Sequence, residues 1–223
     1  MTTPHVLFIL TNAGTIGPND RATGYFFPEV AHPFDVFENA GVAIEYASPK
    51  GGAIPFDGYD DKDRTQVAFK DSAAYRRMNR SRKLADVDVN DYDAIFFPGG
   101  LGPMVDIAMD PDVKRAVVRA WNAGKLVAAV CHGPVAFLGA TLDDGTPFLH
   151  GHRLTGFSNA EEEVYAKADV PFLLESALRG AGATFEEGTP WQPNVVVDGR
   201  LMTGQNPASA GPLAKEVLAA LRK

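Results

Sequence analysis

Four short apolar runs constrain the fold of this chain more than any other feature of its sequence. They occupy residues 6–11, 42–47, 94–98 and 126–130. The apolar residues in these runs are mostly continuous rather than alternating, which is typical of strands covered on both faces, as in a parallel sheet between two layers of helices. The sequence therefore predicts an α/β fold with a mainly parallel sheet.

Helical segments separate the runs in the order expected of a doubly wound sheet. Residues 28–40 place Val30, Phe34 and Phe37 on one stripe, and they end at a glycine, which is a common C-terminal signal. A second helix is predicted over residues 111–123, because its first residue is a proline, and the first helical turn tolerates proline. This alternation of strands and helices predicts a doubly wound α/β domain.

One long segment interrupts the alternation. Residues 48–90 are too long for a simple connection, so we expect a single domain over residues 1–223 with an insertion at about 48–90. Within this insertion, residues 71–85 are expected to form a polar helix. The other expected elements are a helix at 171–180, a hairpin of strands at 195–197 and 201–203, and a closing helix at 207–221.

The charge of the chain argues against two classes of partner. The formal net charge is −7, whereas nucleic acids and anionic membranes are bound through basic surfaces. Eight of the 21 Lys and Arg residues do lie between Lys62 and Lys83, against two acidic residues there, and we interpret this basic cluster as a solvated helix face. We therefore expect neither a nucleic acid nor a membrane as a partner.

The cysteine count and the N-terminus bear on location. A single Cys allows no intrachain disulfide, which is compatible with a reducing compartment. Residues 1–5 lack the basic start of a signal peptide, and the apolar run after them is too short for a signal core or a membrane span. We expect a cytoplasmic protein.

That one cysteine, Cys131, directly follows the fourth apolar run and stands beside His132 and ahead of Gly133 and Pro134. Ligands of α/β sheets bind beyond the carboxyl ends of the strands, and a strand–nucleophile–helix turn would hold the thiol there on a strained backbone. A helix that begins at Gly133 would favour negative charge and lower the pKa of the thiol. The alternative is an inert cysteine buried at the end of a core strand.

Two further motifs fall at the same predicted sheet edge. Residues 98–100 read Pro-Gly-Gly at the end of the third run, where glycines let backbone N–H groups approach a ligand, as an oxyanion site requires. Glu29 lies at the start of the first predicted helix. Its carboxyl group has two possible roles. It either interacts favourably with the helix dipole in the first turn, or it lies beside the thiol and shares a hydrogen bond with it.

Four motifs in order give the chain a family resemblance. They are Cys-His-Gly-Pro at 131–134, Pro-Gly-Gly at 98–100, Glu29 with the His-Pro-Phe of residues 32–34, and Leu-Thr-Gly-Phe at 154–157. Together they resemble the PfpI superfamily, a branch of the class I glutamine amidotransferase-like fold, and within it the group of heat-shock chaperone and glyoxalase III proteins. The resemblance covers nearly the whole chain and implies a flavodoxin-like three-layer sandwich with helices on both faces of the sheet.

The resemblance also implies roles for individual residues. Cys131 is the expected nucleophile, His132 the base, and Glu29 the carboxyl group that touches the thiol. The third acid of this group of proteins follows the Thr-Gly-Phe segment, where Glu162 is the best match and Glu161 or Glu163 remains open.

Three backbone positions are expected to hold the oxyanion, namely Gly99, Gly100 and Leu101. Many relatives carry histidine after the paired glycines, where this chain has Leu101. A role of the histidine side chain is therefore lost here, whereas the backbone N–H group of Leu101 can still bind an oxyanion. Trp191 and Asn206 are expected in the wall of the pocket.

The resemblance implies a glutathione-independent glyoxalase, a lyase that detoxifies methylglyoxal or a related 2-oxoaldehyde by converting it to a 2-hydroxy acid on the cysteine. We expect no cofactor and no metal, and a homodimer. A holdase chaperone, a redox-sensing thiol protein, a PfpI-type cysteine peptidase and a deglycase remain open as alternatives. The glutaminase half of an amidotransferase is disfavoured, because its downstream His-x-Glu pair is missing.

Overall fold

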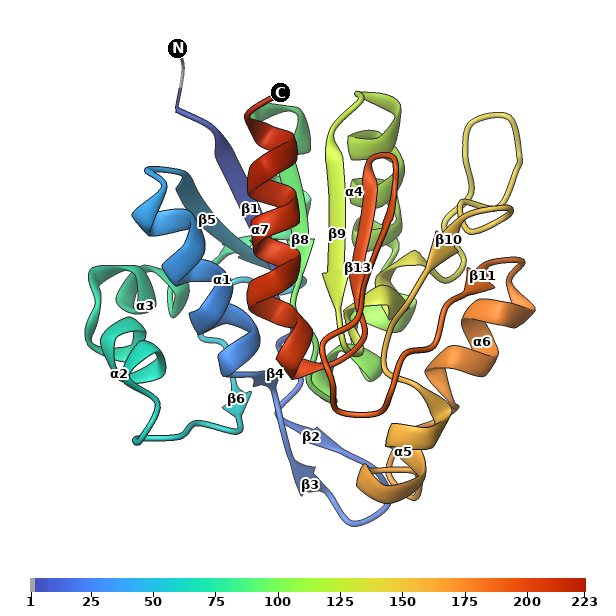
Figure 1. Ribbon diagram of the computed structural model, residues 1–223, viewed down its shortest axis with the longest axis horizontal. Helices are drawn as coiled ribbons and strands as arrows, with labels where there is room; N and C mark the ends of the chain where they lie inside the picture. The colour runs from blue at the N-terminus through green and yellow to red at the C-terminus, as the bar shows by residue number, and fades with distance from the viewer. Residues whose placement is uncertain (1–2) are drawn as a thin grey trace.

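The computed structural model describes residues 3–223, which are organised around one seven-stranded sheet (Figure 1). Its strands are β1 (His5–Ile9), β5 (Ala43–Ser48), β7 (Arg82–Lys83), β8 (Ala94–Phe97), β9 (Leu126–Val130), β12 (Val195–Asp198) and β13 (Leu201–Gly204). They lie in the order β12-β13-β9-β8-β1-β5-β7, and all neighbours are parallel except β12 and β13. The four apolar runs form β1, β5, β8 and β9, so the predicted mainly parallel sheet is confirmed.

Helices cover both faces of this sheet. α1 (Pro28–Asn39) and α7 (Ala210–Leu221) pack against each other on the face toward the viewer in Figure 1, and α4 (Pro111–Asn122) lies behind the sheet. Asp110 caps α4, because its carboxylate accepts hydrogen bonds from two backbone amides of the first turn. The predicted three-layer flavodoxin-like arrangement is therefore confirmed.

Aromatic side chains fix the first helix against the middle of the sheet. Phe8 of β1 stacks on Phe96 of β8 with ring centroids 4.8 Å apart, and it meets Phe37 of α1 edge-on at 6.1 Å. All three rings are buried, and such pairs add about 0.5–1.5 kcal/mol beyond the area they bury. The last turn of α1 is thereby packed on the middle of the sheet.

The predicted helix over residues 71–85 is wrong. The chain instead forms two shorter helices, α2 (Arg64–Asp71) and α3 (Ala73–Met78), followed by the edge strand β7. Ser72 separates the two helices, because its backbone is extended and its hydroxyl accepts a hydrogen bond from the N–H of Tyr75 at 3.1 Å. A serine in this position caps the second helix and ends the first.

The later elements agree with the predictions except at their starts. β12 and β13 form the predicted hairpin. α6 (Leu174–Gly180) begins after an extended Leu173, and a 3-10 turn at Pro207–Ser209 precedes α7. The remaining elements are the pairs β2 (Thr15–Ile16) and β3 (Arg21–Ala22), β4 (Tyr25–Phe26) and β6 (Phe56–Asp57), and β10 (Arg153–Leu154) and β11 (Thr184–Phe185), with α5 (Asn159–Tyr165). None of the helices formed by residues 3–223 is both long and apolar enough to cross a membrane.

The segment 48–90 reaches back to the chain that leads into α1. β6 pairs in parallel with β4, and the N–H of Tyr25 donates to the carbonyl oxygen of Pro55 at 3.0 Å. The two backbones approach closely at Gly24, where a Cβ atom would lie 2.0 Å from that same oxygen. This contact fixes the segment just ahead of Glu29.

We expect Gly24→Ala to lower the free energy of unfolding by about 1–3 kcal/mol, because one of the two backbones must move to admit the methyl group. Urea unfolding measures the change. Gly180→Ala is the matched control, since a Cβ atom there meets nothing within 4 Å, and it should leave stability unchanged or slightly raised. Equal stability of the Gly24→Ala variant and the parent would contradict the close approach.

Candidate active site

Cys131 stands directly after β9, at the carboxyl end of the strand. Its φ is +60°, in the left-handed region that residues other than glycine rarely adopt. Two backbone hydrogen bonds hold it there: its N–H donates to the carbonyl oxygen of Gly204 at 2.9 Å, and its carbonyl oxygen accepts from the N–H of Phe157 at 2.8 Å. The predicted strained turn at the end of the strand is confirmed.

Glycines leave the space that this turn requires. A Cβ atom at Gly133 would lie 2.2 Å from the carbonyl oxygen of Phe97, and one at Gly99 would lie 2.6 Å from the backbone nitrogen of His132. Neither position can accept a side chain unless the backbone shifts. The turns that follow β8 and β9 therefore pack backbone against backbone, which brings the thiol beside the Gly-rich turn.

Two predictions about the thiol are wrong. No α-helix begins after Cys131, because Gly133–Phe137 forms only a short 3-10 helix. The thiol is 3 % exposed, and its burial, followed by the charge of Glu29, raises its pKa well above the ordinary value instead of lowering it. The resting thiol is therefore protonated at neutral pH, and it needs a partner that can take its proton.

His132 and Glu162 lie next to the thiol as a linked pair. Nδ1 of the histidine is 3.4 Å from Sγ of Cys131, and its Nε2 is 2.7 Å from Oε2 of Glu162. Both side chains are almost completely buried. A carboxylate at Nε2 favours the tautomer with the hydrogen on Nε2, which leaves the Nδ1 lone pair facing the thiol. This geometry lets His132 accept the thiol proton.

The three consecutive glutamates of α5 have different surroundings. Glu162 binds His132, whereas Glu163 is exposed and pairs with Lys167 at 2.6 Å. Glu161 is buried and accepts hydrogen bonds from the side-chain amides of Gln205 and Asn206, among others. Of the three, only Glu162 lies on the histidine.

Glu29 lies at the start of α1 with its carboxyl group fully buried. Its Oε2 accepts a hydrogen bond from the N–H of Gly99 at 2.7 Å, and the carboxyl group lies close enough to the Cys131 thiol for each group to shift the pKa of the other. Burial raises the pKa of Glu29 to about 8, although the nearby Cys131 thiol and the N–H of Gly99 act in the opposite direction. At neutral pH this carboxyl group is mainly protonated and can donate to sulfur.

Backbone amides surround the sulfur on a further side. The N–H groups of Gly100 and His132 lie near it, and both lower the pKa of the thiol against the larger effect of burial. Gly100 has a φ of +94°, so this peptide is oriented by a conformation that glycine adopts freely. The Leu101 side chain, in contrast, is packed in the core at 1 % exposure. The structure thus places the N–H groups of Gly100 and His132 beside the sulfur, and the oxyanion role of Gly99, Gly100 and Leu101 stays a prediction.

Aromatic side chains close the site beside the histidine. The ring of Phe157 lies 4.5 Å from that of His132, and it contacts both Trp191 and Tyr165 at 5.6 Å. Trp191, an expected wall residue, is half-exposed, whereas Asn206, the other, is buried and bonds to Glu161.

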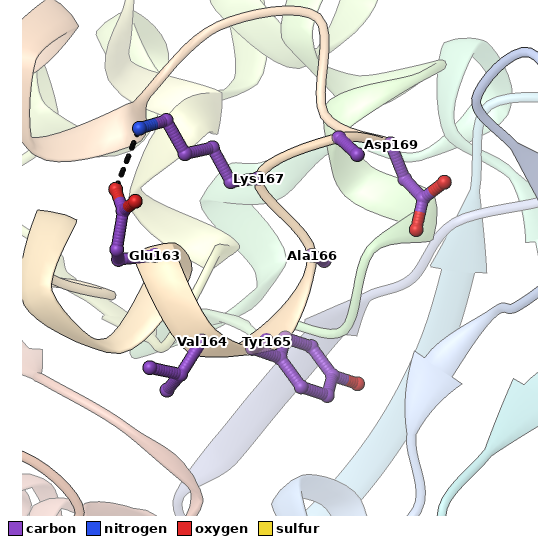
Figure 2. A pocket seen from close by; sticks show the side chains of 7 residues that line it. Glu163, Val164, Tyr165, Ala166, Lys167 and Asp169 are labelled. Atoms are coloured by element: carbon purple, nitrogen blue, oxygen red, sulfur yellow. Dashed lines mark hydrogen bonds and ion pairs between the residues drawn. The ribbon is translucent and has the colours of Figure 1, made fainter.

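Sequence reasoning missed Phe157 and Tyr165 as wall residues. The available signal for Tyr165 was its position three residues after Glu162, which puts both side chains on one face of a helix. Tyr165 also lines a cavity of about 510 Å³ formed by residues 163–169 (Figure 2).

The ring of His152 packs against Trp121 and Phe148. Nδ1 of His152 lies 2.7 Å from Oδ2 of Asp198. Within residues 3–223, no three His, Cys, Asp or Glu side chains come together in a group that could hold a metal ion.

Comparisons with known proteins agree on one family. The model of the DJ-1/PfpI family matches residues 23–220. Glyoxalase 3 of Candida albicans is 32% identical over 96% of this chain and 97% of its own, and the glutathione-independent glyoxalase HSP31 of Saccharomyces cerevisiae is 30% identical over 100% of both. Among solved structures, glyoxalase III from Candida albicans has a TM-score of 0.86 at 30% identity, covering 97% of each chain. The Rapid Encystment Protein of Francisella tularensis has a TM-score of 0.94 at 31% identity, covering 98% of this chain and 99% of its own.

The raised pKa of Glu29 predicts how stability depends on pH. The stability that its protonated form provides is fully present below about pH 4.5 and is lost as the pH rises through about 8. Glutamine is uncharged at every pH, so Glu29→Gln should gain stability relative to the parent across this window, by about 1.4 kcal/mol for each unit of pKa shift.

Urea unfolding of the two proteins at about pH 5 and about pH 9 measures this difference. Glu163→Gln is the control, because it removes an exposed carboxylate and should change stability by less than about 0.5 kcal/mol at either pH. A Glu29→Gln profile that runs parallel to that of the parent would contradict the buried, protonated carboxyl group.

Proposed function

The chain belongs to the DJ-1/PfpI family, and we propose that it is a glutathione-independent glyoxalase that converts methylglyoxal or a related 2-oxoaldehyde to a 2-hydroxy acid. The observation that carries the proposal is the arrangement at Cys131. One thiol lies beside the Glu29 carboxyl group and two backbone amides, and it faces an imidazole that Glu162 orients. Relatives named as glutathione-independent glyoxalases match the chain over nearly its full length.

The first step is formation of a carbon–sulfur bond. His132 takes the thiol proton at Nδ1, and the thiolate adds to the aldehyde carbon, C1. The resulting oxyanion is held by the N–H groups of Gly100 and His132 and then receives the proton back from the imidazole. The product is a hemithioacetal on Cys131.

The second stage moves one proton between neighbouring carbons. His132, again neutral, removes the hydrogen from C1, and the electron pair forms an enediol with C2. Delivery of that proton to C2 yields a thioester of the 2-hydroxy acid on Cys131. Water cleaves the thioester, which releases the acid and restores the thiol. The substrate is isomerised and gains one water molecule in total, so the reaction needs no oxidant, reductant or glutathione.

The carboxyl groups have separate tasks in this scheme. Glu162 holds the Nε2 hydrogen and stabilises the imidazolium when it forms. Glu29, kept protonated by burial, donates to sulfur and so stabilises the thiolate without adding a negative charge beside it. The high pKa of the resting thiol is then compatible with catalysis. The thiolate exists only during the reaction, while His132 holds the proton and Glu29 donates to sulfur.

The assembly and location of the protein are proposed from its sequence and from its exposed apolar side chains. We propose a single-domain subunit that forms a homodimer and works in the cytoplasm. A lone cysteine, buried in the structure, suits a reducing compartment. Exposed apolar side chains such as Val105 and Met109 leave an apolar surface beside a cleft of about 650 Å³ for a second subunit to cover.

The proposed function predicts lactate production from methylglyoxal without glutathione. The parent should form lactate, Cys131→Ala should form none above the uncatalysed rate, and Glu162→Gln should fall by about 10²-fold in kcat/KM, because the histidine loses its orienting charge. Glu163→Gln is the matched control on the same helix and should retain the rate of the parent.

Two results would contradict the proposal. One is a parent that consumes no methylglyoxal, and the other is a Cys131→Ala variant as fast as the parent. Suppression of client aggregation that survives Cys131→Ala, in a parent that forms no lactate, would instead support the holdase alternative.

A further inference from the structure

Tyr165 lies next to the Cys131 site, separated from His132 by the ring of Phe157, but has no part in the chemistry described above. It follows Glu162 by three residues on α5, so both side chains project from one face of the helix. Its ring packs on Phe157, with centroids 5.6 Å apart, and Phe157 in turn lies on the ring of His132. Figure 2 shows the Tyr165 ring on the opposite side of the chain from the Glu163–Lys167 pair.

The hydroxyl group of Tyr165 is available to a ligand. Within residues 3–223 it has no hydrogen-bond partner among the side chains or the backbone. Its oxygen atom is also not fully enclosed by the protein. The residue as a whole is half-buried and lines the cavity shown in Figure 2. Its phenol is therefore neither occupied by the protein nor sealed in the core.

Charged groups of the site affect the pKa of the Tyr165 phenol. Burial raises the pKa of Tyr165, and negative charge on Cys131 and Glu29 raises it further, while Arg21 lowers it. The phenol consequently stays protonated and can only act as a neutral hydrogen-bond donor or acceptor at physiological pH.

Arg21 holds Tyr165 in this position from the neighbouring hairpin. Its guanidinium group donates to the carbonyl oxygen of Tyr165 at 3.3 Å and to Oδ2 of Asp169 at 2.9 Å. The same group lies over the tyrosine ring, 4.9 Å from the centroid. The β2–β3 hairpin that carries Arg21 lies beside α5 in Figure 1. One arginine thus fixes both the backbone and the ring of Tyr165.

We propose that Tyr165 is a substrate-contacting catalytic residue whose hydroxyl donates a hydrogen bond to the 2-oxo oxygen of the substrate bound to Cys131, and that Arg21 is the residue that positions it. This inference rests on the proposed glyoxalase function. It makes the 2-oxo group the feature by which the site selects its substrates, because an aldehyde without that oxygen has nothing to accept the hydrogen bond.

The contact is of most use during proton transfer. In the proposed mechanism the backbone amides of Gly100 and His132, which lie beside the sulfur, bind the oxygen on C1. When the hydrogen leaves C1 as a proton, its electron pair moves toward C2, and negative charge gathers on the second oxygen. A phenol donor there stabilises the enediolate, and no bond to the tyrosine is made or broken.

Tyr165→Phe is the direct test, because it removes only the hydroxyl group and keeps the ring under Arg21. We expect kcat/KM for methylglyoxal to fall by about 10- to 100-fold, mainly in kcat. The rate at which iodoacetamide alkylates Cys131 should stay that of the parent, since the thiol and its partners are untouched. Tyr92→Phe is the matched control: it removes a phenol that bonds to Glu45 ahead of β8, at the far end of the strand, and should turn over like the parent.

Arg21→Met tests the positioning role. It should lower kcat to a similar extent and leave alkylation of Cys131 unchanged. The double variant with Tyr165→Phe should be no slower than Tyr165→Phe alone, because both changes remove the same contact. Fully additive losses would overturn the positioning role of Arg21.

The outcomes separate this inference from the proposed function. A parent that forms lactate only with Cys131 present, together with a Tyr165→Phe variant of equal kcat, overturns the role of Tyr165 and leaves the glyoxalase proposal standing. Parallel losses of turnover and of thiol alkylation in Tyr165→Phe, in protein that still unfolds like the parent, also overturn it, since the residue would then act through the thiol. A parent without turnover overturns both proposals.

Discussion

The left-handed backbone at Cys131 is the constraint around which the rest of the site is arranged. A cysteine pays a conformational cost of about 1–3 kcal/mol for a φ of +60°, and only surrounding contacts can maintain it. Hydrogen bonds to Gly204 and from Phe157 supply part of that support. The glycines at 99 and 133 supply the rest, because their missing side chains let two strand ends pack directly together. The thiol is thereby placed beside the Gly-rich turn that follows β8.

Burial of carboxyl groups is the second organising feature. Glu29, Glu161 and Glu162 are all fully or almost fully buried, which is costly unless each is neutral or bonded. Glu162 has the imidazole, Glu161 has a set of amides, and Glu29 keeps a proton because its pKa is about 8. Burial makes the charged form of a carboxyl group unfavourable, but it also strengthens the electrostatic interactions of Glu29 and Glu162 with their neighbours in the site. The proposed chemistry uses two of these acids, Glu29 and Glu162, which are in different electrostatic situations.

Much of the architecture could be predicted from the sequence. Continuous apolar runs indicate buried strands, and the signals at helix ends mark where helices begin and stop. The order of motifs at strand ends likewise brought Cys131 and Glu29 to one sheet edge. The insertion was harder: Ser72 is a single capping residue within a polar stretch, and whether it divides a helix depends on packing. The thiol pKa was predicted in the wrong direction, because a local pattern cannot show how completely Cys131 is buried or that only a short 3-10 turn follows it.

The choice among three consecutive glutamates shows the same limit. Neighbouring positions on a helix differ by about 100° in direction, so only the docking of α5 decides which carboxylate reaches the histidine. That docking depends on contacts distant in sequence, such as Arg21 on Tyr165 and Asp169. Tyr165 itself carries no motif, and its place on the wall emerges only when the β2–β3 hairpin and α5 lie side by side (Figure 1).

The central claim is that Cys131 and Glu29 titrate as one coupled pair inside a closed site. The most direct measurement is the pH dependence of Cys131 alkylation by iodoacetamide in the parent and in Glu29→Gln. We expect a thiol pKa above the ordinary value in the parent, because Glu29, with a pKa of about 8, is already ionised in the pH range where the thiol titrates and its charge opposes the thiolate. Glutamine carries no charge, so the thiol pKa should be lower in the variant. The same thiol pKa in both proteins would contradict the claim.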